Sequence, residues 1–294
     1  MDNKHFKYGL FFHVFYSEIT SESLSLLEKA KNGGFDGVEI SVTPELLSSN
    51  KDILKELKNR SEDTGISCIF STGLDQSNSV IAPEKDNRCE GINHLKACVD
   101  LVASFGGDVL GGILYGPWGD FTDAPRKKEQ REWCKEALWE VAEYAKKSNV
   151  FLALEPVNRF ESFFLNTAYE ARQLIEEIGH SQIKMQLDTF QMNIDESDLG
   201  EAIRVAGDLL YHFHCCASHR GVPGTGHIDW IEVFKALKEV NYHRWLVIES
   251  FTPDFVNRPG GKKVAIWREL ASPEDIAFRG LYFLRGIEQA VYAL

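Results

Sequence analysis

The 294-residue sequence contains no run of about twenty apolar residues, the length that a membrane-spanning helix needs. Its first nine residues, MDNKHFKYG, are too polar for the apolar region of a secretory leader. The six cysteines are scattered, with no CxxC pair and no spacing typical of secreted domains, so we expect reduced thiols. These absences predict a cytoplasmic protein with no membrane partner.

Positive charge is also scarce in this chain. The 32 lysines and arginines face 44 aspartates and glutamates, which gives a formal net charge of -12 at pH 7. The resulting negative field repels phosphate backbones and anionic lipid headgroups, so we expect neither nucleic acid nor membrane as the main partner. Neither GxGxxG nor GxxxxGK[ST] follows any predicted strand, and this disfavours the open sheets that bind phosphate through such loops.

Apolar segments of strand length alternate with longer amphipathic segments along the whole chain. Strands are predicted at residues 8–14, 37–42, 66–72, 108–114, 150–154, 183–187, 209–213 and 244–248. Helices are predicted at residues 21–31, 51–64, 84–105, 125–148, 168–178, 199–206, 229–240 and 273–293. Strict alternation of eight pairs predicts an α/β fold in which a parallel sheet is covered by helices. We expect this sheet to close into a TIM (β/α)8 barrel, one domain over residues 1–294.

Four residues that favour a divalent cation follow four successive predicted strands, namely Glu155, Asp188, His214 and Glu249. In a closed barrel the carboxyl ends of the strands meet at one mouth, where TIM-barrel enzymes keep their active sites. An open sheet would spread them over roughly 15 Å, at about 4.8 Å per strand. Three carboxylates and one imidazole suit Mn²⁺, Co²⁺ or Mg²⁺. The pattern therefore predicts a metal-dependent active site.

The placement of two of these carboxylates indicates a type of reaction. An ion with two open positions could bind the carbonyl and hydroxyl oxygens of a substrate and stabilise the enediolate formed when a C–H proton leaves. Glu155 and Glu249 lie three strands apart around the ring, so they approach the substrate from different sides. One could remove a proton and the other return it to the opposite face. Two bases favour epimerisation, whereas a single base moves a proton between neighbouring carbons.

Each candidate ligand also has a plainer interpretation. A single carboxylate at a strand end is more often a helix cap or an ion-pair partner, although four in register are harder to dismiss. His212 faces the same side of its strand as His214 and is a further candidate ligand, but we favour a supporting or core role for it. We interpret Cys215 and Cys216 as packing residues.

Other residues at the predicted strand ends suggest a pocket. Phe11 and Trp118 belong to aromatic-rich stretches that close the first and fourth predicted strands, and in a barrel they would wall a pocket of sugar size. Aromatic residues at such places belong as often to the hydrophobic core. His94 and His180 fall on helical segments or at their ends and are expected at the surface.

Several stretches of the chain form a recognisable set. They are ALEPVNRFE at 153–161, QLDTFQMN at 186–193, HFH at 212–214 followed by Arg220 and PGTG at 223–226, IESF at 248–251 and IWR at 266–268. The set resembles the ketose 3-epimerases, the D-tagatose and D-allulose 3-epimerase group of the xylose-isomerase-like TIM barrels. That family carries ALExxNRFE, QLDTFHMN, HxH…R…PGxG, MEPF and VWR.

The resemblance implies an activity and a role for each matching residue. A Mn²⁺ ion, or Co²⁺ or Mg²⁺, would be held by Glu155, Asp188, His214 and Glu249, with the two glutamates as the acid/base pair. Glu161 and Arg220 would hold the O1 and O2 end of a small sugar substrate, with Arg220 offsetting the charge of the enediolate. The implied reaction is inversion of C3 of a ketose, carried out by a homodimer or homotetramer.

Two positions and the segment 215–219 depart from the family pattern. Gln191 stands where the family has a histidine that contacts the substrate oxygens; glutamine can donate a hydrogen bond there but cannot carry a positive charge. Ser250 replaces a proline. These departures concern the choice of sugar more than the reaction class.

Alternative functions follow from the same residues. A related sugar isomerase, or an epimerase or lyase acting on 3-oxo-glycosides, would use a similar enediolate. A nuclease of this superfold would need more histidines for several zinc ions and a basic face. A sugar-binding protein with a relic metal site would have no need of both Glu155 and Glu249.

Overall fold

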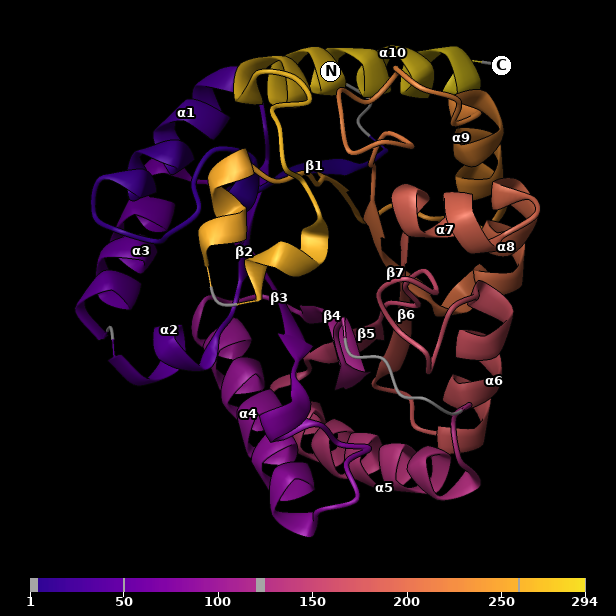
Figure 1. The fold of residues 1–294 in the computed structure, drawn as a ribbon. Helices are drawn as coiled ribbons and strands as arrows, with labels where there is room; N and C mark the ends of the chain where they lie inside the picture. Colours follow the sequence, from indigo (N-terminus) through magenta and orange to yellow (C-terminus); the bar gives the residue numbers. More distant parts are fainter. Residues whose placement is uncertain (1–4, 50, 120–124, 259, 294) are drawn as a thin grey trace.

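The computed structural model describes residues 5–49, 51–119, 125–258 and 260–293, and eight parallel strands form its centre (Figure 1). They are β1 (Lys7–Phe11), β2 (Gly37–Ser41), β3 (Ser67–Leu74), β4 (Val109–Pro117), β5 (Phe151–Leu154), β6 (Ile183–Asp188), β7 (Leu210–His214) and β8 (Trp245–Ile248). Each strand pairs with the next one in the chain, and β8 pairs with β1. The predicted closed TIM barrel is therefore confirmed.

Helices surround this barrel as an outer layer (Figure 1). They are α1 (Leu26–Gly33), α2 (Pro44–Ser49), α3 (Lys51–Thr64), α4 (Lys85–Ser104), α5 (Lys128–Ala145), α6 (Ala168–Ile178), α7 (Thr189–Asp195), α8 (Leu199–Ala206), α9 (Trp230–Glu239) and α10 (Gly280–Tyr292). The eight predicted helices are all present. The short helices α2 and α7 were not predicted, because each follows a strand so closely that the sequence shows no separate amphipathic period.

Local signals explain where the helices begin and end. The Thr167 side chain caps α6 by accepting a hydrogen bond from the backbone N–H of Glu170 at 3.2 Å, and Gly179 ends the helix in the left-handed conformation. Asp188 caps α7 in the same way, since its Oδ1 accepts from the N–H of Phe190 at 2.7 Å. The last residue of β6 is thereby fixed in direction by the helix that follows it.

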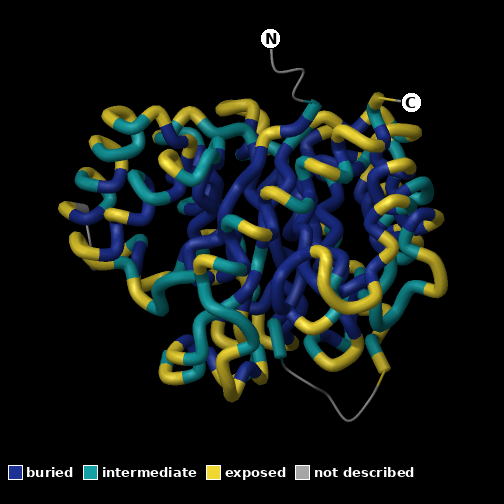
Figure 2. Tube along the Cα trace, turned by 90° about the horizontal axis from the view of Figure 1, so that it is seen from above, coloured by how far each residue is buried: buried dark blue, intermediate teal, exposed yellow. Residues whose placement is uncertain are grey.

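The core of the molecule fills the barrel and the layer between strands and helices. In Figure 2 the buried segments run through the middle of the molecule, and the exposed segments lie on its outer parts. Every residue of β4 is buried, as expected for a parallel strand that is covered on both faces. Among the described residues, no helix is long and apolar enough to cross a membrane.

Polar side chains also enter the barrel interior, and a glycine makes room for them. Glu39, Gln186 and His212 are at most 1% exposed. A Cβ atom at Gly111 of β4 would lie only 2.1 Å from Oε1 of Gln186, so a larger residue there would require this amide to move. The interior below the mouth is thus built around hydrogen-bonding groups and not around apolar side chains alone.

The surface placement predicted for His94 and His180 is wrong. His94 is 6% exposed and lies 3.0 Å from Oγ1 of Thr72, and His180 is 9% exposed and lies 2.8 Å from Oε1 of Glu143. Hydrogen-bond partners of this kind reduce the cost of burying an imidazole. Cys215 and Cys216 are buried, in agreement with the prediction that they pack in the interior. All six cysteines are unpaired.

Candidate active site

The carboxyl ends of the strands surround a cavity that contains the predicted site residues. Its lining includes Phe11, Trp118, Glu155, Glu161, Gln191, His214, Arg220 and Glu249. Asp188 is fully buried in the adjoining wall. Phe255 and Val264, from the segment after β8, close part of the opening, and this segment lies across the end of the barrel in Figure 1. The structure therefore brings all nine predicted residues to one place.

Strand register brings the candidate metal ligands together. Asp188 and His214 are the last residues of β6 and β7 and are paired across the sheet, while Glu155 and Glu249 directly follow β5 and β8. One ligand atom each from Glu155, Asp188 and His214 lies within 4.8 Å of the other two. Oε1 of Glu249 lies 3.5 Å from Nδ1 of His214. Three carboxylates and an imidazole thus converge from four successive strands.

The Arg220 guanidinium lies among these carboxylates. Its Nη1 donates to Oδ2 of Asp188 at 3.0 Å, contacts Oε2 of Glu249, and lies 3.1 Å from Sγ of Cys216. The rings of Phe190 and Phe251 flank it, with centroids 4.1 and 5.4 Å from Cζ. The pairing of one guanidinium nitrogen with two carboxylates shows that this position attracts positive charge. The three carboxylates and one imidazole also form a donor set that fits a divalent cation.

Arg220 occupies an unusual backbone conformation. Its φ of +61° lies in the left-handed region, which costs a residue with a side chain on the order of 1–3 kcal/mol when the surroundings impose it. Two hydrogen bonds hold it there: its N–H donates to the carbonyl of Ala217 at 2.9 Å, and the Ser250 hydroxyl donates to its carbonyl at 2.5 Å. Proline at position 250 could not make the second bond. Ser250 thus has a structural reason to depart from the family pattern.

The surroundings shift the acidities of the four candidate ligands unequally. Burial, together with the nearby charges of Glu249 and Asp188, raises the pKa of Glu155 well above its usual range. Burial also raises the pKa of Asp188, to about 6, although Arg220 opposes it. Burial acts in the same direction on Glu249, but Arg220 and His214 outweigh it and lower the pKa of Glu249 to about 2. The surroundings therefore favour the protonated form of Glu155 and the ionised form of Glu249.

The surroundings of His214 favour the protonated form of its imidazole. Burial alone would lower the pKa of His214, but the carboxylates of Glu39 and Glu249 raise it well above its usual range. Because cation binding needs deprotonated ligands, the raised pKa values of His214 and Glu155 make a divalent cation compete with protons at both groups.

The other end of the cavity holds Glu161 in a fixed position. Its Oε2 accepts from the indole N–H of Trp118 at 2.8 Å, and its Oε1 accepts from the side-chain amides of Asn158 at 3.0 Å and Gln191 at 3.1 Å. The side-chain oxygen Oε1 of Gln191 in turn accepts from the backbone N–H of Asn158 at 2.9 Å. Gln191 thus orients a carboxylate that faces the cavity.

Sequence reasoning missed three residues of this region. Glu39 on β2 is fully buried, and its signal was a charged residue inside an otherwise apolar predicted strand. Asn158 lies within the family motif at 153–161, where only its neighbours drew notice. His13 lines the cavity and accepts from Arg258 at 2.9 Å; burial and this arginine lower the pKa of His13 to about 3. His13 is therefore neutral at physiological pH.

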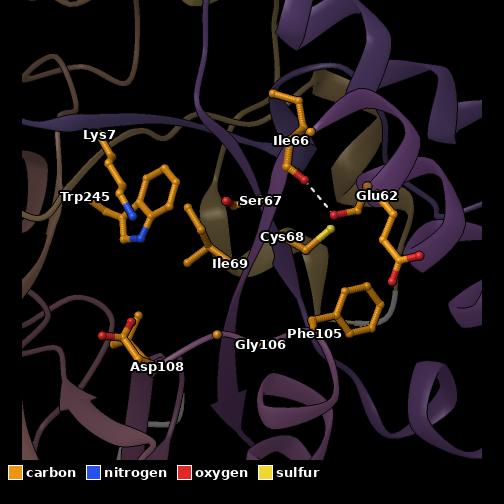
Figure 3. A pocket seen from close by; sticks show the side chains of 14 residues that line it. Lys7, Glu62, Ile66, Ser67, Cys68, Ile69, Phe105, Gly106, Asp108 and Trp245 are labelled. Atoms are coloured by element: carbon orange, nitrogen blue, oxygen red, sulfur yellow. Dashed lines mark hydrogen bonds between the residues drawn. The ribbon is translucent and has the colours of Figure 1, made fainter. Parts of the chain in front are cut away.

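A larger hollow lies at the opposite end of the barrel. It measures about 320 Å³, against about 100 Å³ for the cavity at the mouth. Figure 3 shows Lys7 beside the indole of Trp245 there, with Cys68 and Phe105 on the other side. None of the nine predicted site residues lines this hollow, and the amino-terminal face of TIM barrels is associated with stability and not with catalysis. Choosing the site by cavity volume alone would therefore select the amino-terminal end of the barrel, away from the predicted residues.

Known proteins resemble this chain in both sequence and fold. Residues 27–285 match the xylose isomerase-like TIM barrel family. L-ribulose 3-epimerase from Mesorhizobium japonicum is 39% identical over 256 residues, 86% of this chain and 84% of that protein. D-psicose 3-epimerase from Ruminiclostridium cellulolyticum is 32% identical over 271 residues, covering 92% of this chain and 91% of that protein. The crystal structure of D-allulose 3-epimerase from Methylomonas sp. in complex with D-allulose superposes with a TM-score of 0.90 at 27% identity, covering 96% and 97% of the two chains.

Removing the Ser250 hydroxyl should destabilise the protein. Ser250→Ala leaves the carbonyl of Arg220 without its side-chain donor in a fully buried environment. We expect the free energy of unfolding to fall by about 1–3 kcal/mol, measured by denaturant titration. Ser250→Thr should retain most of the stability, and Ser48→Ala, an exposed serine, serves as the control. A Ser250→Ala protein as stable as the wild type would show that this hydrogen bond does not support Arg220.

Proposed function

We propose that this chain, which belongs to the xylose isomerase-like TIM barrel family and is an epimerase acting on ketose sugars, inverts C3 of its substrate with Glu155 and Glu249. The observation that carries the proposal is the placement of these two carboxylates. They reach one cavity from β5 and β8, and their pKa values are shifted in opposite directions. An acid and a base on different sides of a carbon are what inversion requires.

The opposite pKa shifts favour different roles for the two glutamates in proton transfer. In one direction Glu249 would act as the base that removes the C3 proton, and Glu155 would act as the acid that returns a proton to the other face. The reverse reaction exchanges the two roles. Arg220 would offset the negative charge that develops on the O2 oxygen of the enediolate, since its guanidinium lies beside Glu249 in the cavity.

Glu161 and Gln191 would position the sugar for this transfer. The carboxylate of Glu161 is held by Trp118, Asn158 and Gln191, so its direction is set before a sugar arrives. Phe11 and Trp118 supply aromatic walls that exclude water from the reacting carbon. The neutral amide of Gln191 makes this end of the cavity less cationic than a histidine would.

Glu155, Asp188, His214 and Glu249 are the residues that would hold a divalent cation. Their oxygen-rich donor set suits Mn²⁺, Co²⁺ or Mg²⁺, and two observations support this assignment: ligand atoms of Glu155, Asp188 and His214 lie within 4.8 Å of one another, and Glu249 lies 3.5 Å from His214. When bound, the ion would polarise the ketose carbonyl and stabilise negative charge on the adjacent oxygens. Arg220 neutralises part of the same acidic cluster, so it lowers the charge that the ion must balance.

The substrate class can be tested directly with a panel of sugars. Free ketoses, aldoses and oxidised glycosides are each incubated with the Mn²⁺-supplemented protein, and the products are separated by chromatography. We expect epimers at C3 from at least one free ketose. A protein that is inert to every free ketose but converts an oxidised glycoside would assign the site to the second substrate class instead.

Replacing either glutamate should abolish turnover without unfolding the chain. Glu155→Gln and Glu249→Gln each remove one proton-transfer group, and we expect a loss of at least about 10²- to 10⁴-fold in kcat. Solvent deuterium incorporated into C3 of the ketose, measured by mass spectrometry, reports the same step. Glu177→Gln, on the outer helix α6, should retain full activity. If both site variants fail to fold, the carboxylates have a structural role; if both turn over normally, the mechanism is wrong.

Metal affinity should depend on pH in a defined direction. Asp188 has a pKa raised to about 6 in the metal-free protein, so below that value a proton competes with the cation for its carboxylate. Affinity for Mn²⁺ therefore falls as the pH drops through about 6, by up to about tenfold per pH unit for this one proton, and the raised pKa values of Glu155 and His214 strengthen the same trend. Calorimetric titration of chelator-treated protein measures this. Full activity after thorough chelation would contradict a metal requirement.

A further inference from the structure

A fully buried carboxylate lies beneath the cavity and belongs to no role assigned so far. Glu39 is on β2, and it contacts two histidines of β7 across the interior of the barrel. One of its oxygens lies 2.7 Å from Nε2 of His212, and both oxygens lie near Nε2 of His214, at 3.1 and 3.2 Å. β2 and β7 are not adjacent strands, so this contact ties together opposite sides of the barrel.

Hydrogen-bond chemistry fixes the direction of these contacts. An ionised carboxylate only accepts hydrogen bonds, so the Nε2 atoms of His212 and His214 must both carry the hydrogen. The geometry agrees with this acceptor role, because both oxygens of the fully buried Glu39 carboxylate lie within 3.2 Å of an imidazole nitrogen. The other nitrogen of His214, Nδ1, then points away from Glu39 and lies 3.5 Å from Oε1 of Glu249.

The neighbours of His214 leave its ring little freedom to turn. The amide nitrogen of Gln186 lies 3.5 Å from Nδ1 and 3.4 Å from Nε2 of His214, nearly equidistant from both, so it packs against the ring. Gly111 makes room for this amide, since a Cβ there would lie 2.1 Å from its oxygen. Glu39 itself does not line the cavity, and His214 is the lining residue that it contacts.

We propose that Glu39 is a positioning residue, which holds His214 with hydrogen on Nε2 and presents Nδ1 to the cavity as a ligand for a divalent cation. The inference rests on the proposed function, because it requires that a cation bind at this mouth. A second ring nitrogen bonded to a carboxylate is the usual support of a metal-binding histidine, and losing such a partner weakens affinity by about 10- to 100-fold. The Nε2 atom of His212 also contacts the Glu39 carboxylate, at 2.7 Å, and so helps to hold it in place.

The test compares cation affinity in matched variants of the full-length, metal-depleted protein. Glu39→Gln keeps the shape of the side chain but replaces one acceptor oxygen with a donor. Mn²⁺ binding is measured by the electron paramagnetic resonance signal of free Mn²⁺, and we expect binding about 10- to 100-fold weaker than in the wild type. We also expect the visible absorption spectrum of the Co²⁺-loaded variant to change, because the orientation of a ligand changes.

A second buried glutamate provides the control. Glu288 accepts hydrogen bonds from the Tyr8 hydroxyl at 2.7 Å and from the backbone N–H of His5 at 2.8 Å, and it does not line the cavity. Glu288→Gln should lower stability while leaving Mn²⁺ affinity at the wild-type level. Equal Mn²⁺ affinity in folded Glu39→Gln and Glu288→Gln proteins, with the Co²⁺ spectrum unchanged, would overturn the proposal.

A measurement on the wild type covers the case in which Glu39→Gln does not fold. Nitrogen-15 chemical shifts of labelled histidines, recorded with diamagnetic Mg²⁺, report which ring nitrogen carries hydrogen. We expect hydrogen on Nε2 of His214; hydrogen on Nδ1 would refute the assignment. Failure of the proposed function would give a different result. The wild type would then show no divalent-cation binding, or only binding that Asp188→Asn leaves unchanged.

Discussion

The fold imposes one electrostatic constraint on this molecule: closing eight parallel strands into a barrel brings buried acidic side chains to a single mouth. Ligand atoms of Glu155, Asp188 and His214 lie within 4.8 Å of one another, and Glu249 adjoins them. Carboxylates this close cannot all remain ionised without positive charge nearby. The raised pKa values of Glu155 and Asp188 are the direct consequence.

Arg220 supplies positive charge at this mouth, and its backbone is strained in this position. The left-handed conformation of Arg220 directs its guanidinium to Asp188 and Glu249, between two aromatic rings, and the Ser250 hydroxyl supports the strained peptide. A divalent cation would satisfy the same carboxylates from the cavity side. In this view three features together balance the charge around a bound sugar. They are the acidic mouth, the strained Arg220 and the buried Glu39 beneath His214.

The sequence predicted the parts of this arrangement that depend on regular alternation and on motifs. Eight strand–helix pairs predicted the closed barrel, and strand ends predicted where Asp188 and His214 lie, because parallel register places all carboxyl ends on one face. The resemblance to ketose 3-epimerases is confirmed, and the nine predicted residues meet in one region. Their individual roles, the identity of the ion and the predicted homodimer or homotetramer stay predictions.

What the sequence could not supply are contacts made across the barrel and burial decided by tertiary packing. Glu39 and His214 are far apart in the chain and on strands that do not pair, so no local pattern links them. His94 is buried because Thr72 offers it a partner, which a helical period alone does not reveal. The central claim is that the acidic mouth binds one cation. Anomalous diffraction from Mn²⁺-soaked crystals tests it most directly: the account predicts one Mn²⁺ peak bounded by Glu155, Asp188, His214 and Glu249. No peak there, with Arg220 still paired to Asp188 and Glu249, would contradict it.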